Sequence, residues 1–305
     1  MNRRPGRRQI LGGIAAAAAT VTVLPGGGRA FAQEAPAPGG GLTDRLRTLE
    51  GAHSARLGVF AQNIATGRTV AYRAHELFPL CSTFKTIAVA AVLRDLDRDG
   101  TYLARRLQYT AKDVTDSGYA PITGLPANLE AGMTVEELCA AALQYSDNTA
   151  ANLLLRELGG PESITRFCRS IGDRVTRLDR WEPALNSAEP GRPTDTTSPH
   201  ALGLTYARLT LGPTLGARDR QQLTKWLLGN TTGANRLRAG LPSTWTVAEK
   251  TGTGNYGTTN DAGVTWPRSR GPIAVTVLST KHAADAPADE PLIAEAARLV
   301  ATALA

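Results

Sequence analysis

Ser82 and Lys85 are the two residues whose types and spacing most clearly suit chemistry, in the run Cys81-Ser82-Thr83-Phe84-Lys85. Residues three apart on a helix lie on the same face, so this lysine can exchange a proton with the serine hydroxyl. A lysine withdrawn from water loses its proton near neutral pH, which an arginine does not. Only five of the 34 basic side chains are lysines. The pair therefore indicates a serine nucleophile for acyl transfer.

Apolar side chains follow Ser82 at helical spacing, and they include Phe84, Ile87, Ala88 and Ala91. This pattern predicts a buried helix that begins at Ser82. The partial positive charge at the N-terminus of a helix stabilises a developing oxyanion by up to about 1 kcal/mol. The predicted helix would therefore both position the nucleophile and favour its attack.

Two further motifs lie where predicted elements end. Thr134-Val135-Glu136-Glu137 is a capping box that opens a helix, and that helix runs into Ser146-Asp147-Asn148. These three residue types prefer caps and turns, so we expect a junction between two helices there, with Asp147 as a structural cap. Lys250-Thr251-Gly252 ends an alternating stretch that begins at Trp245 and is typical of a strand.

The order of the predicted elements indicates a mixed α+β fold. A helix from Leu42 and a hairpin turning at Ala65-Thr66-Gly67 come first, a long helical block follows, and three strands and a helix over Leu292–Leu304 come last. We expect one antiparallel five-stranded sheet built from both ends of the chain and flanked by the terminal helices. An all-helical subdomain (about 78–227) is inserted into the α/β subdomain (about 42–77 and 228–305), with the active site between the two.

The N-terminus has the features of an export signal. Arg7-Arg8 precedes an apolar stretch from Leu11 to Leu24, and Ala30-Phe31-Ala32 has the form of a cleavage site. We predict a twin-arginine signal over residues 1–32, a flexible lead-in over 33–41, and a periplasmic or extracellular protein without a stable membrane anchor.

Composition and charge narrow the range of partners. The formal charge of +7 includes five arginines of residues 1–32, where no acid occurs, so the remainder carries +2. We therefore expect no nucleic-acid partner. Three cysteines, Cys81, Cys139 and Cys168, cannot all pair, and neither a metal site nor any cofactor is indicated.

Taken together and in this order, Ser82-x-x-Lys85, Ser146-Asp147-Asn148 and Lys250-Thr251-Gly252 resemble the motifs of the serine penicillin-recognising family. The segment Arg180-Trp181-Glu182-Pro183-Ala184-Leu185-Asn186 with the later Asp195 resembles the omega loop of its class A β-lactamases. The resemblance extends from about Leu42 to the C-terminus. It implies a β-lactamase domain over 42–305 that acts, as a monomer, on small-molecule β-lactams.

The resemblance also implies roles for the residues that carry it. Ser82 would attack the lactam carbonyl, and either Lys85 or Glu182 would take its proton, a choice that stays open. Ser146 and Lys250 would pass a proton to the departing nitrogen. Glu182 and Asn186 would position the water that clears the acyl-enzyme.

The substrate would be held by other residues of the same motifs. The backbone N–H groups of Ser82 and Thr253 would bind the oxyanion. Arg236 would replace an arginine that many relatives carry where this chain has Thr259. The remaining assignments are as follows: substrate binding by Asn148, Thr251, Gly252, Thr253, Tyr119 and Thr232, and an ion pair closing the loop between Arg180 and Asp195.

Two other functions share this nucleophile. A penicillin-binding protein or D-alanyl-D-alanine peptidase would use Ser82 on peptidoglycan, and a penicillin sensor would be acylated without turnover. The penicillin-binding proteins and peptidases lack the carboxylate that activates water, so Glu182 favours hydrolysis of penicillins and cephalosporins, and with it resistance to these antibiotics. A sensor is not expected, since the sequence shows no transmembrane segment or partner domain for one.

Overall fold

The computed structural model describes residues 41–268 and 270–304. The predicted export signal over 1–32, and all of the predicted lead-in except Gly41, lie outside these residues and stay predictions. Within the described part of the chain, no helix is long and apolar enough to cross a membrane.

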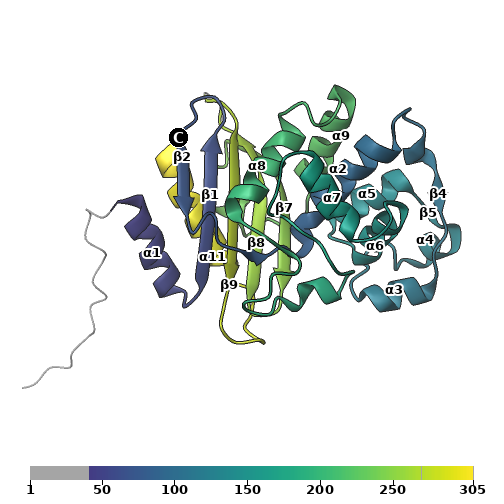
Figure 1. Ribbon diagram of the computed structural model, residues 1–305, viewed down its shortest axis with the longest axis horizontal. Coiled ribbons are helices and arrows are strands. Elements are labelled where there is room, and N and C mark those ends of the chain that lie inside the picture. Colours follow the sequence, from purple (N-terminus) through teal and green to yellow (C-terminus); the bar gives the residue numbers. More distant parts are fainter. Residues whose placement is uncertain (1–40, 269, 305) are drawn as a thin grey trace, which may run out of the picture. The chain divides into compact units, whose positions relative to one another are not determined.

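A five-stranded antiparallel sheet forms the centre of the described structure (Figure 1). Its strands are β1 (Arg56–Asn63), β2 (Thr69–Tyr72), β7 (Thr246–Gly254), β8 (Thr258–Trp266) and β9 (Ile273–Thr280). They lie in the order β2-β1-β9-β8-β7, so an N-terminal strand pairs with the last strand of the chain, with Val59 opposite Val277. The predicted mixed fold, with one sheet built from both ends of the chain, is confirmed.

Helices cover both faces of this sheet, so most residues of β1, β8 and β9 are buried on both sides. Helices α1 (Leu42–Ala52) and α11 (Glu290–Leu304) share an apolar core with Leu57 and Val275. On the opposite face, Ala207 of α8 (Pro199–Thr210) packs against Val264. Helix α8 therefore joins the sheet layer, although it belongs to the block predicted as helical.

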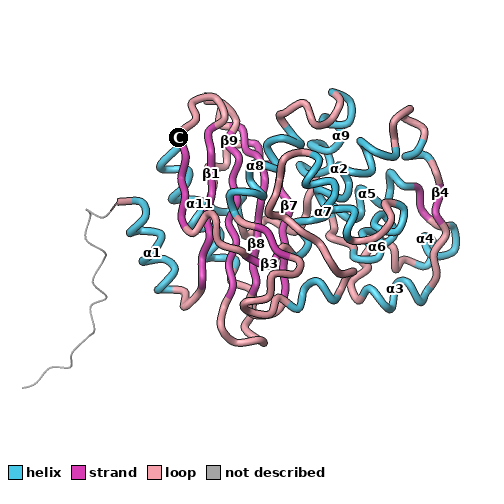
Figure 2. The backbone as a smooth tube through the Cα atoms, viewed as in Figure 1, coloured by secondary structure: helices cyan, strands magenta, loops and turns pink. Residues whose placement is uncertain are grey.

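The inserted helical part lies beside the edge strand β7, and Figure 2 shows its helices clustered at one side of the sheet. Its central helix α2 (Phe84–Ala91) is buried along its whole length, as expected for a helix that is apolar all round. The surrounding helices are α3 (Ala111–Ser117), α4 (Pro126–Ala131), α5 (Val135–Gln144), α6 (Asn148–Glu157), α7 (Glu162–Ser170) and α9 (Ala217–Leu228). The short α10 (Leu237–Gly240) packs instead on α11, in the core that α11 shares with α1.

Two small ribbons complete the helical part, and neither was predicted. Strand β3 (Phe78–Pro79) pairs with β6 (Thr196–Thr197), and β4 (Arg106–Leu107) pairs with β5 (Met133–Thr134). Strands of two residues are too short for the alternation that identifies a strand in a sequence. The first ribbon ties the segment that leads to Ser82 to the segment that follows Asp195.

The junction between α5 and α6 forms as predicted and is built around Asp147. This carboxylate is fully buried, caps α6 by accepting the Ala150 N–H at 2.9 Å, and accepts the Ile122 and Thr123 N–H groups at 3.0 and 2.9 Å. The capping box at Thr134 also forms and begins α5. Asp147 thus fixes the backbone on which Ser146 and Asn148 lie.

The Asp147 network leads to a test of stability. Replacing Asp147 by Ala should lower the free energy of unfolding by about 3 kcal/mol, because several buried donors lose their acceptor. Asp147→Asn keeps one acceptor oxygen and should lose less. Urea denaturation followed by circular dichroism measures both. Equal losses in the two variants would contradict this account.

Candidate active site

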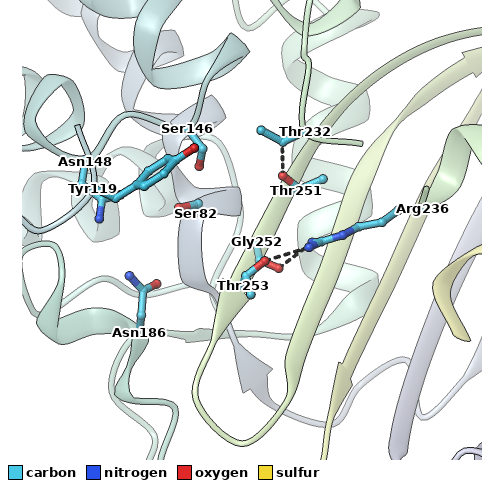
Figure 3. Close-up of a pocket in the computed structure, with 10 residues that line it drawn as sticks. All are labelled: Ser82, Tyr119, Ser146, Asn148, Asn186, Thr232, Arg236, Thr251, Gly252 and Thr253. Carbon is cyan, nitrogen blue, oxygen red and sulfur yellow. Dashed lines mark hydrogen bonds between the residues drawn. The ribbon is translucent and has the colours of Figure 1, made fainter. Parts of the chain in front are cut away.

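A cleft of about 320 Å³ lies between the helical part and strand β7. The ten residues that line it were all singled out from the sequence. Figure 3 shows them on two facing walls. One wall carries Ser82, Tyr119, Ser146, Asn148 and Asn186. The other carries Thr232, Arg236, Thr251, Gly252 and Thr253.

Ser82 lies in a 3₁₀ turn (Cys81–Thr83) that leads into α2. The preceding Cys81 has φ of 44°, a left-handed conformation that costs a residue other than glycine about 1–3 kcal/mol. The Ser82 hydroxyl donates to Glu182 Oε1 at 3.3 Å. In the described part of the chain, its hydrogen bond therefore goes to Glu182 and not to Lys85.

Lys85 is fully buried on the first turn of α2. Its Nζ donates to the Ser146 carbonyl and to Asn148 Oδ1, both at 2.7 Å, and lies 3.1 Å from Glu182 Oε1. Burial lowers the pKa of Lys85, and the Glu182 carboxylate opposes this shift. One lysine thus links both helices of the junction to the glutamate.

Lys250 approaches Ser146 from the opposite wall. It is fully buried on β7, and its Nζ donates to Ser146 Oγ at 3.0 Å. Lys85 Nζ lies 3.5 Å from the same hydroxyl. Burial lowers the pKa of Lys250 to about 7, and the charge of Lys85 acts in the same direction. The Ser146 hydroxyl therefore lies between two ammonium groups that can exchange protons with it.

The loop between Arg180 and Asp195 carries Glu182 and is closed at its neck by these two residues. Arg180 Nε donates to Asp195 Oδ2 at 2.5 Å, and Asp195 Oδ1 accepts the Arg180 N–H at 3.0 Å. Asn186 Nδ2 donates to Glu182 Oε2 at 2.5 Å. The loop thus presents a carboxylate and an amide together at the cleft.

Asn152 on α6 also holds this loop, and the sequence analysis missed it. Its Oδ1 accepts the Glu182 N–H at 3.0 Å and its Nδ2 donates to the Glu182 carbonyl at 2.9 Å. The only signal in the sequence is an asparagine inside a helix, where this residue type is a poor helix former. That signal is too weak to single out one position.

Arg236 provides the positive charge of the second wall. Its Nη1 donates to the Gly252 carbonyl at 2.9 Å and its Nη2 to Thr253 Oγ1 at 2.8 Å, as the dashed lines in Figure 3 show. Thr259 lies buried on β8, and its hydroxyl donates to the Gly257 carbonyl. Glu290, at the start of α11, accepts the Arg236 Nε–H at 3.1 Å, a contact that the sequence analysis missed.

The remaining predicted residues lie at the rim of the cleft or support its walls. Thr232 Oγ1 and Thr251 Oγ1 share a hydrogen bond. Tyr119 is half exposed, and its carbonyl accepts the Asn148 N–H at 2.8 Å. The three cysteines are buried free thiols.

Comparisons with known proteins agree with this geometry. The β-lactamase enzyme family matches residues 41–304. A β-lactamase of Streptomyces lavendulae is 63% identical over 302 residues, which cover 99% of this chain and 98% of that protein.

Solved β-lactamase structures are also similar to this chain. The structure of a β-lactamase from Streptomyces albus G has a TM-score of 0.86 and 62% sequence identity, covering 87% of this chain and 99% of that one. An ancestral class A β-lactamase has a TM-score of 0.82 and 53% identity, covering 87% and 100%. The chain therefore belongs to the β-lactamase enzyme family, and within it to class A.

Proposed function

We propose that this chain hydrolyses the β-lactam amide of penicillins and cephalosporins through an acyl-enzyme on Ser82, and thereby confers resistance to them. The observation that carries the proposal is that one glutamate oxygen, Glu182 Oε1, lies within reach of both the Ser82 hydroxyl and Lys85 Nζ at the cleft. Membership of class A supports the same reaction.

Acylation begins when Ser82 Oγ attacks the lactam carbonyl carbon. We propose that Glu182 takes the hydroxyl proton, because its Oε1 is the hydrogen-bond partner of this hydroxyl at 3.3 Å. The tetrahedral intermediate carries a negative charge on the former carbonyl oxygen. The backbone N–H groups of Ser82 and Thr253 bind this oxygen, and a donor of this kind generally contributes about 3 kcal/mol.

The carbon–nitrogen bond then breaks as the ring nitrogen receives a proton from Ser146. Lys85 replaces that proton across 3.5 Å, and Glu182 returns its own proton to Lys85 across 3.1 Å. The proton from Ser82 thus ends formally on the nitrogen, and the three relaying groups regain their starting states. The lowered pKa of Lys85 favours this transfer.

Deacylation depends on Glu182 and Asn186. Asn186 Oδ1 is buried and has no hydrogen-bond partner among the described residues, so it can accept a bond from the hydrolytic water. Glu182 takes a proton from this water as it attacks the ester carbonyl, and Ser82 leaves with that proton. A penicillin-binding protein lacks this deacylating carboxylate, so the pair favours hydrolysis of the β-lactam acyl-enzyme.

Substrate binding depends on the cationic wall. We propose that Lys250, Arg236 and the hydroxyls of Thr232, Thr251 and Thr253 bind the carboxylate of the β-lactam. Asn148 binds the side-chain amide of the substrate, and Tyr119 packs against its ring system at the mouth of the cleft. Gly252 lines the cleft and lets the turn that carries Ser82 pack closely on β7, since a Cβ atom there would lie 3.2 Å from Cys81 Cβ.

Export completes the proposal. Residues 1–32 have the composition of a twin-arginine signal, and a protein that destroys cell-wall antibiotics acts where they meet their targets. We propose that the mature chain acts as a monomer in the periplasm or outside the cell.

Mass spectrometry after mixing with a penicillin tests the acyl-enzyme. Wild type should turn over. Glu182→Ala should form the Ser82 adduct slowly, because it lacks the acylation base, and should then retain it, because it lacks the carboxylate that activates water. Ser82→Ala should do neither. Loss of a general base lowers kcat by about 10²–10⁴-fold. Glu189→Ala removes another acid of the same loop as a control and should retain turnover. Turnover that survives the Ser82 change would refute the mechanism.

The pH dependence of kcat/KM tests the role of Lys250. A lysine is charged below its pKa, and the pKa of Lys250 is lowered to about 7, so the free enzyme loses this positive charge as pH rises through about 7. We expect kcat/KM to fall over the same range. In Lys250→Arg the charge persists, and the decline should move to higher pH. An unchanged profile would exclude Lys250 as the titrating group.

A further inference from the structure

Glu249 and Asp261 form a buried pair of acids that the mechanism above does not use. Glu249 lies on β7 next to Lys250, and Asp261 lies on β8 directly opposite Thr251. Since residues two apart on a strand share a face, both side chains lie on the same face of the sheet as Thr251. Both are fully buried. Two adjacent carboxylates without water are costly unless something neutralises one of them.

Asp261 Oδ1 has no hydrogen-bond partner among the described residues, and Glu249 Oε1 makes none either, although Arg238 Nε lies 3.1 Å from it as an ion pair. The two side chains lie on the same face of adjacent strands, and burial and the Glu249 charge raise the pKa of Asp261 well above its usual range. A single proton shared between the two carboxyl groups would give Asp261 Oδ1 a partner and leave one negative charge on the pair, which faces Arg238 at Glu249 Oε1.

The other two oxygens anchor the segment 230–237 at both of its ends. Glu249 Oε2 accepts Asn230 Nδ2 at 2.7 Å, and Asp261 Oδ2 accepts the Leu237 N–H at 3.1 Å. Between these anchors, a Cβ atom at Gly233 would lie only 2.1 Å from Glu249 Oε1. The segment therefore packs directly on the carboxyl pair.

This segment carries two residues of the cationic wall. Asn230 Oδ1 accepts the N–H and hydroxyl of Thr232 at 3.1 and 2.9 Å, and Thr232 in turn bonds Thr251. Arg236 directly precedes Leu237, whose N–H is held by Asp261. The position of both wall residues thus depends on the acid pair.

We propose that Glu249 and Asp261 share one proton and through it hold the segment 230–237 in place, so that Thr232 and Arg236 face the substrate carboxylate. Both acids are positioning residues, since neither lines the cleft. The inference rests on the proposed function for the identity of the ligand, a carboxylate-bearing lactam.

Charged and titratable groups surround the pair from each packed element. Arg238 of α10 places its Nε 3.1 Å from Glu249 Oε1, and Arg236 lies beside it in the chain. Lys250 is adjacent on β7, and Tyr206 of α8 interacts with both acids from the other side of the sheet. Arg238 faces the negative charge that remains on the pair, and the shared proton removes the second charge.

The shared proton is tested on the folded protein without any substrate. Wild type should show the infrared carbonyl band of a protonated carboxyl group at pH 8, and Asp261→Asn should lack it. Asparagine replaces the protonated acid without needing a proton. An unfolded aspartate has a pKa of about 3.9, so above that pH only the folded wild type keeps this proton, at a cost in stability. The gain in melting temperature of Asp261→Asn over wild type should therefore grow between about pH 4 and 8.

Penicillin kinetics test the positioning role. Asp261→Ala should raise KM about 10-fold, the effect of one lost buried hydrogen bond, and leave kcat within about 3-fold. Asp261→Asn should restore the wild-type KM. If Asp261→Ala does not fold, Asn230→Ala severs the other anchor and should raise KM alike. Asp173→Ala removes a buried acid that does not line the cleft, and should lower the melting temperature without changing KM.

The proposal and the proposed function fail in different ways. Absence of the infrared band, or a stability gain that does not grow with pH, would refute the shared proton. An unchanged KM in both Asp261→Ala and Asn230→Ala, or a KM in Asp261→Asn as high as in Asp261→Ala, would refute the positioning role. Lack of turnover by wild type would instead refute the proposed function, and the infrared and melting experiments would still decide on the proton.

Discussion

The buried contact between Lys85 and Glu182 is the interaction on which the rest of the site depends. Two opposite charges withdrawn from water are stable only when further hydrogen bonds satisfy them, and breaking such a pair leaves an uncompensated charge. The Ser146 carbonyl and Asn148 supply those bonds to Lys85, and Asn152 and Asn186 hold Glu182. The helix junction and the loop are therefore both built around the same pair. This shared support places a nucleophile, a relay hydroxyl and a carboxylate within hydrogen-bond reach without any cofactor in the proposed reaction.

The two walls of the cleft differ in how they carry charge. The helical wall carries a nearly balanced pair, whereas the β7 wall concentrates Lys250 and Arg236 above buried acids. A site that binds a carboxylate and also transfers protons needs two kinds of charge arrangement. Fixed positive charge attracts the substrate carboxylate, and a lysine with a lowered pKa can give up and regain a proton. The separation follows from the fold, because one wall is made of helix termini and the other of a sheet edge. The charge on each wall therefore depends on the residues that pack against that wall, and can change without altering the other.

Much of this could be predicted because the chemistry lies in short motifs. Ser82 with Lys85, and Ser146 with Asn148, are close in the chain, so their geometry follows from local helix structure. The sheet could be predicted from the hairpin that turns at Ala65-Thr66-Gly67 and from the alternating stretch that begins at Trp245. Asn152, Glu290 and the Glu249–Asp261 pair escaped prediction because their partners are distant in sequence and each alone resembles an ordinary polar residue. The ribbons β3–β6 and β4–β5 are too short to produce a periodic pattern, and they depend on contacts between segments far apart in the chain.

The pairing of β1 with β9 has a consequence for how the chain folds during its synthesis. The N-terminal hairpin cannot complete its sheet until β9, the last strand, has left the ribosome. The apolar faces of β1 and β2 therefore stay unpaired with β9 during most of synthesis. Strand β7, which forms one wall of the cleft, joins the sheet only through β8 and β9. A nascent chain that already contains Ser82, Lys85 and Glu182 therefore has no complete cleft. The cleft is therefore completed only after the strands at the C-terminal end of the chain have been made.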